Sequence, residues 1–270
     1  MNRLKDPDFK TIMLNLLKDI PDYLIEELQF AVQLKDKTTL MQILVSIVEE
    51  ELNKLVELYG KQVGRQLSED IKTATQGEFR QILLCTIKDV RLPTPIIINL
   101  FGEEKQFFID ENKNYSITEA RLLNGYLSKQ PIDKNNITET FCEVDYFDLD
   151  EINTEYKRIY GESLEDAIQK KTSGFYKETL LAMMSSGRKR ARLTAKWIHD
   201  ALFSTPVNKR RLTRLLITRS EIDLYTVMIV YQEIYKTSLE SDIKRRTEGL
   251  YKKTLLTLLG LNKKCPFTPK

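Results

Sequence analysis

The sequence is poor in the residues that build metal clusters, disulfide frameworks and tight turns. Its 270 residues include one histidine, three cysteines, ten glycines and eight prolines. A lone histidine, His199, cannot build a zinc site. Cys85, Cys142 and Cys265 are odd in number and far apart, so we expect reduced thiols rather than a disulfide framework. The scarcity of glycine and proline favours a chain that is mostly helical.

Long apolar runs and a charge of one sign are also lacking. No apolar run approaches the roughly 20 residues that span a bilayer, and the first residues hold no apolar segment of a secretory signal. Lys and Arg number 42 against 39 Asp and Glu, a net charge of +3. This balance excludes a basic nucleic-acid arm spread over the chain but leaves room for a local basic face. No P-loop, nucleophile elbow, paired-acid or zinc-protease motif occurs, so we do not expect an enzyme. From the missing signal segment and the balanced charge, we expect a cytoplasmic protein that binds no nucleic acid.

What the chain does contain is one pattern that occurs three times with every spacing preserved. The copies are Leu67, Ile71, Thr75, Gly77, Phe79, Leu83, Leu84; Leu164, Ile168, Thr172, Gly174, Tyr176, Leu180, Leu181; and Leu239, Ile243, Thr247, Gly249, Tyr251, Leu255, Leu256. In each copy, Leu and Ile four residues apart share a helical face, and Thr-x-Gly then ends that helix before another begins. With the amphipathic segments upstream, each unit is predicted to be about five short helices. The repeat therefore predicts an all-α fold.

The units have unequal surroundings. Phe9, Met13 and Leu14 reproduce the aromatic and Leu-Leu positions, with Pro7 in place of the glycine. We therefore interpret the start of the chain as the last helix of another unit. The predicted boundaries are 1–17 for this remnant, 18–88, 118–187 and 188–260 for the full repeats, 89–117 for a linker containing Pro93, Pro95 and Gly102, and 261–270 for a tail.

These residues resemble the annexin repeat. Leu212–Leu224, with its Arg-Ser-Glu-Ile-Asp-Leu, is similar to the fourth repeat of that family, and Tyr160–Ile168 and Lys171–Gly174 are equally typical. The resemblance covers Phe9 to Gly260. It implies that the three full repeats are the second, third and fourth, and that the first is almost wholly absent. It also implies a curved array of five-helix repeats whose convex face docks on acidic phospholipid through calcium.

The calcium ligands of the family are missing here. The family supplies backbone carbonyls from a Gly-x-Gly-Thr loop and a carboxylate just before Thr-x-Gly, as a hard ion requires. The corresponding loops here lack these glycines and are 33–38, 128–133 and 204–211. The carboxylate positions hold Ala74, Lys171 and Arg246. A cation at this position repels calcium, so we expect no cofactor and no family metal site. Weak unconventional sites using Asp133, Glu221 or Asp223 stay open as an alternative.

Basic side chains gather in both sets of loops. If the annexin fold holds, they lie together on the convex face, where an ammonium or guanidinium can meet a lipid phosphate directly. The predicted lipid-binding residues are Lys35, Lys37, Lys129, Lys134, Lys170, Lys171, Lys209, Arg210, Arg211, Arg245 and Arg246. Each contributes on the order of 1 kcal/mol near an anionic leaflet. The alternative is that they are ordinary solvated charges.

The sequence therefore predicts a peripheral membrane protein that binds acidic phospholipid largely without calcium. One alternative is a cytoskeletal scaffold, the role of the giardins, which are divergent annexin-like proteins of some protists that often lack the calcium loops. Its partners would then be cytoskeletal proteins. Another alternative is calcium-dependent lipid binding through the unconventional sites.

Overall fold

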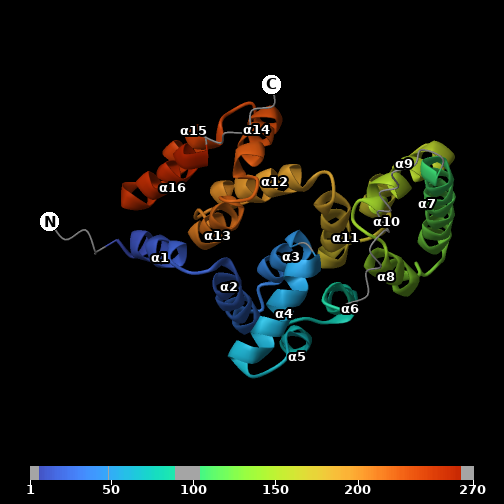
Figure 1. Cartoon of the computed structure of the whole chain (residues 1–270), viewed down its shortest axis with the longest axis horizontal. Helices are drawn as coiled ribbons and strands as arrows, with labels where there is room; N and C mark the ends of the chain where they lie inside the picture. Colours follow the sequence, from blue (N-terminus) through green and yellow to red (C-terminus); the bar gives the residue numbers. More distant parts are fainter. Residues whose placement is uncertain (1–5, 48, 89–103, 263–270) are drawn as a thin grey trace. The chain divides into compact units, whose positions relative to one another are not determined.

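A computed structural model describes residues 6–47, 49–88 and 104–262 of the chain. Within these residues the structure consists of sixteen α-helices and no strand (Figure 1). The helices are α1 Pro7–Leu16, α2 Ile20–Leu34, α3 Lys37–Ser46, α4 Glu49–Val63, α5 Leu67–Ala74, α6 Gly77–Thr86, α7 Glu104–Ser128, α8 Lys134–Glu143, α9 Asp148–Tyr160, α10 Leu164–Lys171, α11 Gly174–Ser186, α12 Arg190–Phe203, α13 Lys209–Arg219, α14 Leu224–Tyr235, α15 Leu239–Arg246 and α16 Gly249–Asn262.

In the part of the chain that the structure describes, the predicted five-helix repeats are confirmed as α2–α6, α7–α11 and α12–α16, and α1 precedes them. The fourth helix of each repeat begins at the pattern's first leucine, and the fifth begins at its glycine. Glycine is required there because φ is positive, for example 65° at Gly249. The threonine side chain closes the preceding helix, as Thr247 does by donating to the Ile243 carbonyl at 2.7 Å.

The apolar residues of the pattern form the core of the repeats. Leu67 and Ile71 are fully buried, as are Leu164 and Ile168. Trp197 is also buried in this core. Each repeat therefore buries the face that the spacing of its sequence predicts.

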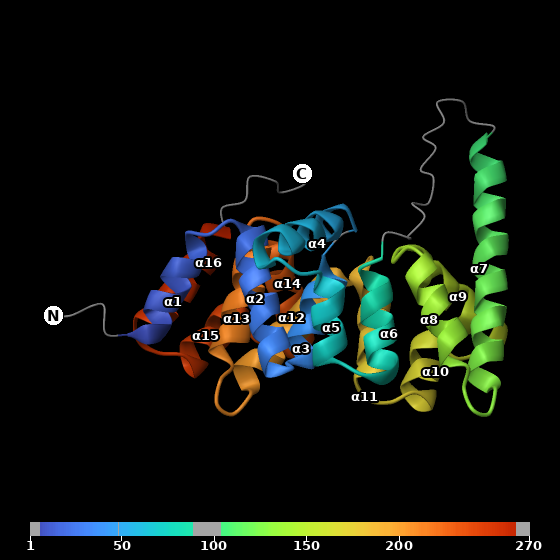
Figure 2. The same cartoon turned by 90° about the horizontal axis from the view of Figure 1, so that it is seen from below.

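The described residues divide into two compact units. Unit 1 holds the residues up to Leu24 and those from Lys189 onward, and unit 2 holds Ile25 to Arg188. In unit 1, α1 packs on α13 and α16 (Figure 2); in unit 2, α6 packs on α8 and α11. Helix α1 thus makes in unit 1 the contacts that the last helix of the second repeat makes in unit 2. This equivalence supports the interpretation of α1 as the last helix of a repeat.

The structure corrects the predicted linker. Helix α7 begins at Glu104, so the second part of 89–117 is helical, while residues 89–103 lie outside the described residues. The asparagines at 112 and 114 lower helix propensity only modestly. Farther along, the helix is held by Ser116, Ala120 and Leu123, which are buried at helical spacing. The other repeat boundaries stay predictions.

The expectation of reduced thiols is wrong for one pair of cysteines. Cys85 of α6 and Cys142 of α8 form a disulfide, with their Cα atoms 5.9 Å apart. They are 57 residues apart in the sequence, and only the packing of α6 on α8 brings them together. Cys265 lies outside the described residues.

Candidate functional site

The loops that join the first and second helices are capped by side chains. In the third repeat, Asp133 caps α8 by accepting from the Asn136 N–H at 3.2 Å. In the fourth, Asn208 caps α13 by accepting from the Arg211 N–H at 3.0 Å. These short polar side chains satisfy the free N–H groups of the helix start. The two loops are therefore held against defined helix ends.

In the fourth repeat, Arg246 joins the two loops predicted to converge. Its Nε donates to the Leu202 carbonyl at 3.1 Å, and its Nη2 donates to the Ser204 carbonyl at 3.4 Å. Arg246 ends α15, whereas Leu202 and Ser204 lie at the end of α12, 44 and 42 residues earlier. The guanidinium therefore supplies a fixed positive charge to the carbonyls of the first loop, at the position where the resemblance places a carboxylate.

In the third repeat, Lys171 lies in the equivalent position. It is exposed and lines a shallow cavity of about 400 Å³ together with 127–132, the loop between α7 and α8. Here too, the two loops of the repeat lie together. Among the residues that the structure describes, no hydrogen bond joins Lys171 to this loop, so its ammonium is less constrained than the guanidinium of Arg246.

The second repeat lacks a basic residue at this position. Ala74 is buried, and the nearby Arg80 Nε donates to the Thr75 carbonyl at 2.7 Å, in the short loop between α5 and α6. Lys35 is exposed with φ of 53°. The Lys37 ammonium lies 5.5 Å from the centre of the Phe175 ring, which belongs to the third repeat of the same unit.

Several predicted lysines are ion-paired. The Lys129 ammonium lies 2.6 Å from the Asp133 carboxylate. Its hydrogen bond to this carboxylate holds the pKa of Asp133 below its usual range. Lys170 lies 2.5 Å from Glu162, whose carboxylate raises the pKa of the lysine. Their charges are partly offset, so they contribute less to an electrostatic surface than the sequence predicted.

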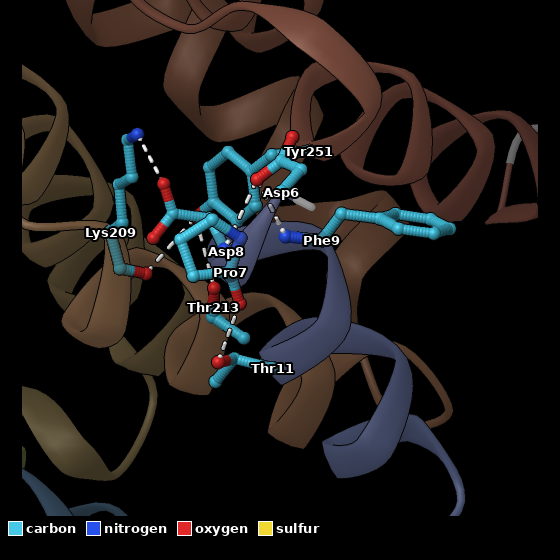
Figure 3. Close-up of polar contacts among 8 residues, drawn as sticks. All are labelled: Asp6, Pro7, Asp8, Phe9, Thr11, Lys209, Thr213 and Tyr251. Atoms are coloured by element: carbon cyan, nitrogen blue, oxygen red, sulfur yellow. Dashed lines mark hydrogen bonds and ion pairs between the residues drawn. The ribbon is translucent and has the colours of Figure 1, made fainter. Parts of the chain in front are cut away.

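Two further lysines tie one repeat to another. The Lys209 ammonium lies 2.5 Å from Asp8 of α1 (Figure 3), and the Lys134 ammonium lies 2.7 Å from Glu78 of α6. The Tyr251 hydroxyl also donates to the Lys209 carbonyl at 3.0 Å (Figure 3). Asp8 and Glu78 are the second residues of equivalent helices, so the same ion pair occurs in both units. Lys134 and Lys209 therefore serve first to stabilise the contact between repeats.

Arg245 is oriented by a buried carboxylate that the sequence analysis missed. Its Nη2 lies 2.8 Å from Asp242, which is 1% exposed and accepts from the Tyr231 hydroxyl at 2.9 Å. The signal was available, because Asp70 stands at the same place in the second repeat and accepts from the Tyr59 hydroxyl. In the third repeat this position holds Ala167.

A second missed residue is Phe203, the last residue of α12. The guanidinium carbons of Arg245 and Arg246 lie 5.6 and 5.1 Å from the centre of its ring. His199 stacks on Phe203 at 4.3 Å and on Tyr235 at 3.8 Å between ring centres. His199 thus supports an aromatic stack.

The remaining predicted residues, Arg210 and Arg211, begin α13. Arg210 is exposed and Arg211 is half-buried. The predicted lipid-binding residues of the last repeat are divided, because Arg245 and Arg246 lie against Phe203 whereas Lys209 is bound to Asp8.

The residues at the family's calcium position do not fit a calcium ion. Calcium takes six to eight oxygen ligands, but Ala74, Lys171 and Arg246 supply no side-chain oxygen. Arg246 already donates to the loop carbonyls. Within the described part of the chain, no group of three or more His, Cys, Asp and Glu side chains gathers to hold a metal ion.

The unconventional positions are partly engaged as well. Asp133 caps α8 and pairs with Lys129, and Asp223 lies 2.5 Å from the buried Arg219. This ion pair is an internal salt bridge of the last repeat. Glu221 is exposed. Among the helices that the structure describes, none is long and apolar enough to cross a membrane.

Comparison with known proteins identifies the family. The annexin family profile matches residues 26–85, 118–183 and 194–258. Annexin B22 of Schistosoma mansoni is 30% identical over 268 residues, covering 94% of this chain and 72% of that protein. A solved structure of annexin A8 matches with a TM-score of 0.83 at 23% identity and covers 97% of this chain and 78% of that one. A calcium-bound alpha-14 giardin matches with a TM-score of 0.75 at 15% identity, covering 94% and 80%.

The annexin match is the better of the two, since the giardin is less similar in both fold and sequence. Annexins are generally non-enzymatic proteins that bind phospholipid in association with calcium and attach peripherally to membranes. The five-helix repeats, the matched profile and the similarity to annexin B22 agree with one another, and this chain belongs to the annexin family.

Proposed function

We propose that this annexin docks on acidic phospholipid through basic loop side chains, without a calcium bridge. One observation carries the proposal: the Arg246 guanidinium donates to the carbonyls of Leu202 and Ser204, at the position where the resemblance places the metal's carboxylate. A fixed cation brings positive charge to the loop and disfavours a second cation by repulsion. A lipid phosphate can then bind to the side chain itself.

The basic residues are expected to contribute unequally to lipid binding. Lys171 takes the equivalent position in the third repeat and is exposed, as is Lys35. Arg245 is also exposed, although Asp242 offsets part of its charge. Lys129, Lys134, Lys170 and Lys209 are paired with carboxylates and contribute less. Each unpaired basic residue near an anionic leaflet is expected to contribute about 1 kcal/mol.

Co-sedimentation with phosphatidylserine vesicles in the presence of a calcium chelator tests the proposal. We expect binding at low salt that is lost at high salt, because ions screen exposed charges beyond a Debye length of about 10 Å at 0.1 M. The double substitution Lys171→Gln and Arg246→Gln should weaken binding by about 2 kcal/mol. The matched control, Lys54→Gln with Lys61→Gln, removes the same charge from exposed positions on α4 and should change binding far less.

Two other results would replace the proposal by its alternatives. A protein that sediments with filaments or tubulin but with no vesicle, whatever the calcium and salt, is a cytoskeletal scaffold of giardin type. Binding that requires calcium and resists salt indicates unconventional metal sites, for which Glu221 is the first residue to substitute.

A further inference from the structure

The fourth repeat holds two adjacent guanidinium groups in a fixed arrangement that the other repeats lack. Arg245 and Arg246 both lie against the Phe203 ring, with their guanidinium carbons 5.6 and 5.1 Å from its centre. Arg246 donates to the carbonyls of Leu202 and Ser204, the residues on either side of Phe203. The ring and the two arginines therefore form one surface element, which we call the arginine pair.

Neighbouring residues hold the arginine pair and its ring in place. Asp242 is 1% exposed and binds Arg245 at 2.8 Å, and the Tyr231 hydroxyl fixes that carboxylate at 2.9 Å. Phe203 is itself held by stacking on His199. The side-chain entropy that a flexible arginine loses on binding a ligand is thus largely lost on folding already.

The pair keeps hydrogen-bonding capacity toward solvent. A guanidinium has five N–H bonds; within the described part of the chain, Arg246 uses its Nε and Nη2 on the loop, and Arg245 uses its Nη2 on Asp242. Phe203 is 37% exposed between them. The free edges of both guanidinium groups are therefore donors for an anion that approaches the ring.

Resting on the proposed function, we propose that the arginine pair is a site for a phosphate monoester carried by a membrane lipid. A monoester has three terminal oxygens and is close to doubly charged at neutral pH, so it can accept from two guanidinium groups at once. A phosphodiester such as phosphatidylserine offers two free oxygens and one negative charge. Because Asp242 leaves the pair with a net charge near +1, discrimination comes from hydrogen-bond geometry rather than from charge alone.

The third repeat provides an internal comparison. It places Lys170 and Lys171 where the fourth has the arginine pair, and Ser128 stands five residues before the helix cap, as Phe203 does. Lys170 is bound to Glu162. Lysine is a point charge without a planar fork, so the third repeat is expected to attract anions without selecting between phosphate classes.

The test compares phosphatidylcholine vesicles that contain phosphatidic acid with others that contain phosphatidylserine, matched for surface charge, in chelator. We expect the full chain to bind the phosphatidic acid vesicles about tenfold more tightly. Arg245→Lys with Arg246→Lys keeps the charge and should abolish the preference, so that the two kinds of vesicle are bound equally. Phe203→Leu should reduce the preference. Lys170→Gln with Lys171→Gln should weaken binding to both vesicles in parallel and leave their ratio unchanged.

The outcomes separate this inference from the proposed function. Equal wild-type binding to both vesicles, or a preference that survives the double lysine variant, overturns the arginine pair and leaves the proposed function intact. No binding to either vesicle overturns both. Inorganic phosphate is added as a soluble competitor at a concentration equal to that of the accessible lipid: a preference that persists supports the lipid as the source, and one that is lost overturns it. Circular dichroism confirms that each variant is folded.

Discussion

The Lys209 ammonium lies 2.5 Å from the Asp8 carboxylate, 201 residues earlier in the chain. Unit 2 contains the same contact between Lys134 and Glu78, 56 residues apart. In both units, the second residue of the last helix of one repeat binds the first residue of the second helix of another. This ion pair therefore lies at the junction between repeats in both units. The two lysines, predicted from the sequence to bind lipid, stabilise that junction instead.

Substituting Asp8→Asn should lower the free energy of unfolding by about 0.5 kcal/mol, because both partners are more than a third exposed and water screens them. A double-mutant cycle with Lys209→Gln, followed by urea unfolding, measures the coupling. The Lys134 and Glu78 pair is the matched comparison. A coupling that does not decrease with salt would contradict the assignment of an exposed ion pair.

The acid stability of unit 2 should depend on Glu78. Hydrogen bonding to Lys134 lowers the pKa of Glu78 from 4.5, so the folded state holds its proton less firmly than the unfolded state. The resulting stability is present above pH 4.5 and is lost as the pH falls through the lowered pKa. In urea unfolding across the acid range, the free energy of unfolding should vary less with pH for Glu78→Gln than for the wild type. Identical profiles would show that the pair is absent in solution.

The buried Asp242 should contribute more to the free energy of unfolding than an exposed ion pair does. Asp242→Ala leaves the buried Tyr231 hydroxyl without its acceptor and should destabilise the fold by about 1–3 kcal/mol. Asp70→Ala tests the equivalent carboxylate of the second repeat, where the Tyr59 hydroxyl loses the same partner. Thermal unfolding followed by circular dichroism measures both. An unchanged unfolding temperature in both variants would refute the role of these carboxylates.

The disulfide between Cys85 and Cys142 can be tested by thiol counting. The unfolded, unreduced protein should react with one equivalent of a thiol reagent, and the reduced protein with three, because the sequence holds three cysteines. Since the bond closes a loop of 57 residues, Cys142→Ser should lower the free energy of unfolding by about 2–4 kcal/mol under oxidising conditions. Three reactive thiols in the unreduced protein would contradict the disulfide.

Much of the fold could be predicted because the repeat pattern reports local structure. The leucine, isoleucine and glycine positions specified where the fourth and fifth helices begin, as seen at Leu239 and Gly249. The extent of α7 was missed because Pro93, Pro95 and Gly102 lie shortly before its start and favour a linker. The register of the repeat was also enough to place Arg246 at the first loop.

The chemistry of the candidate site was less accessible to sequence reasoning. The partners of Lys134 and Lys209 lie on other repeats, and no local spacing reports them. The role of Phe203 depends on the direction of its ring at the end of α12, which no periodicity encodes. Asp242 was the exception, because its recurrence as Asp70 is visible in the aligned copies.

The most direct test of the account is the dissociation constant for phosphatidylserine vesicles, measured at one ionic strength with calcium and with chelator. If the chain's own cations replace the metal, the two constants should agree within about twofold. If calcium tightens binding by about tenfold or more, equivalent to roughly 1.4 kcal/mol, a metal bridges protein and lipid after all, and the central claim is wrong.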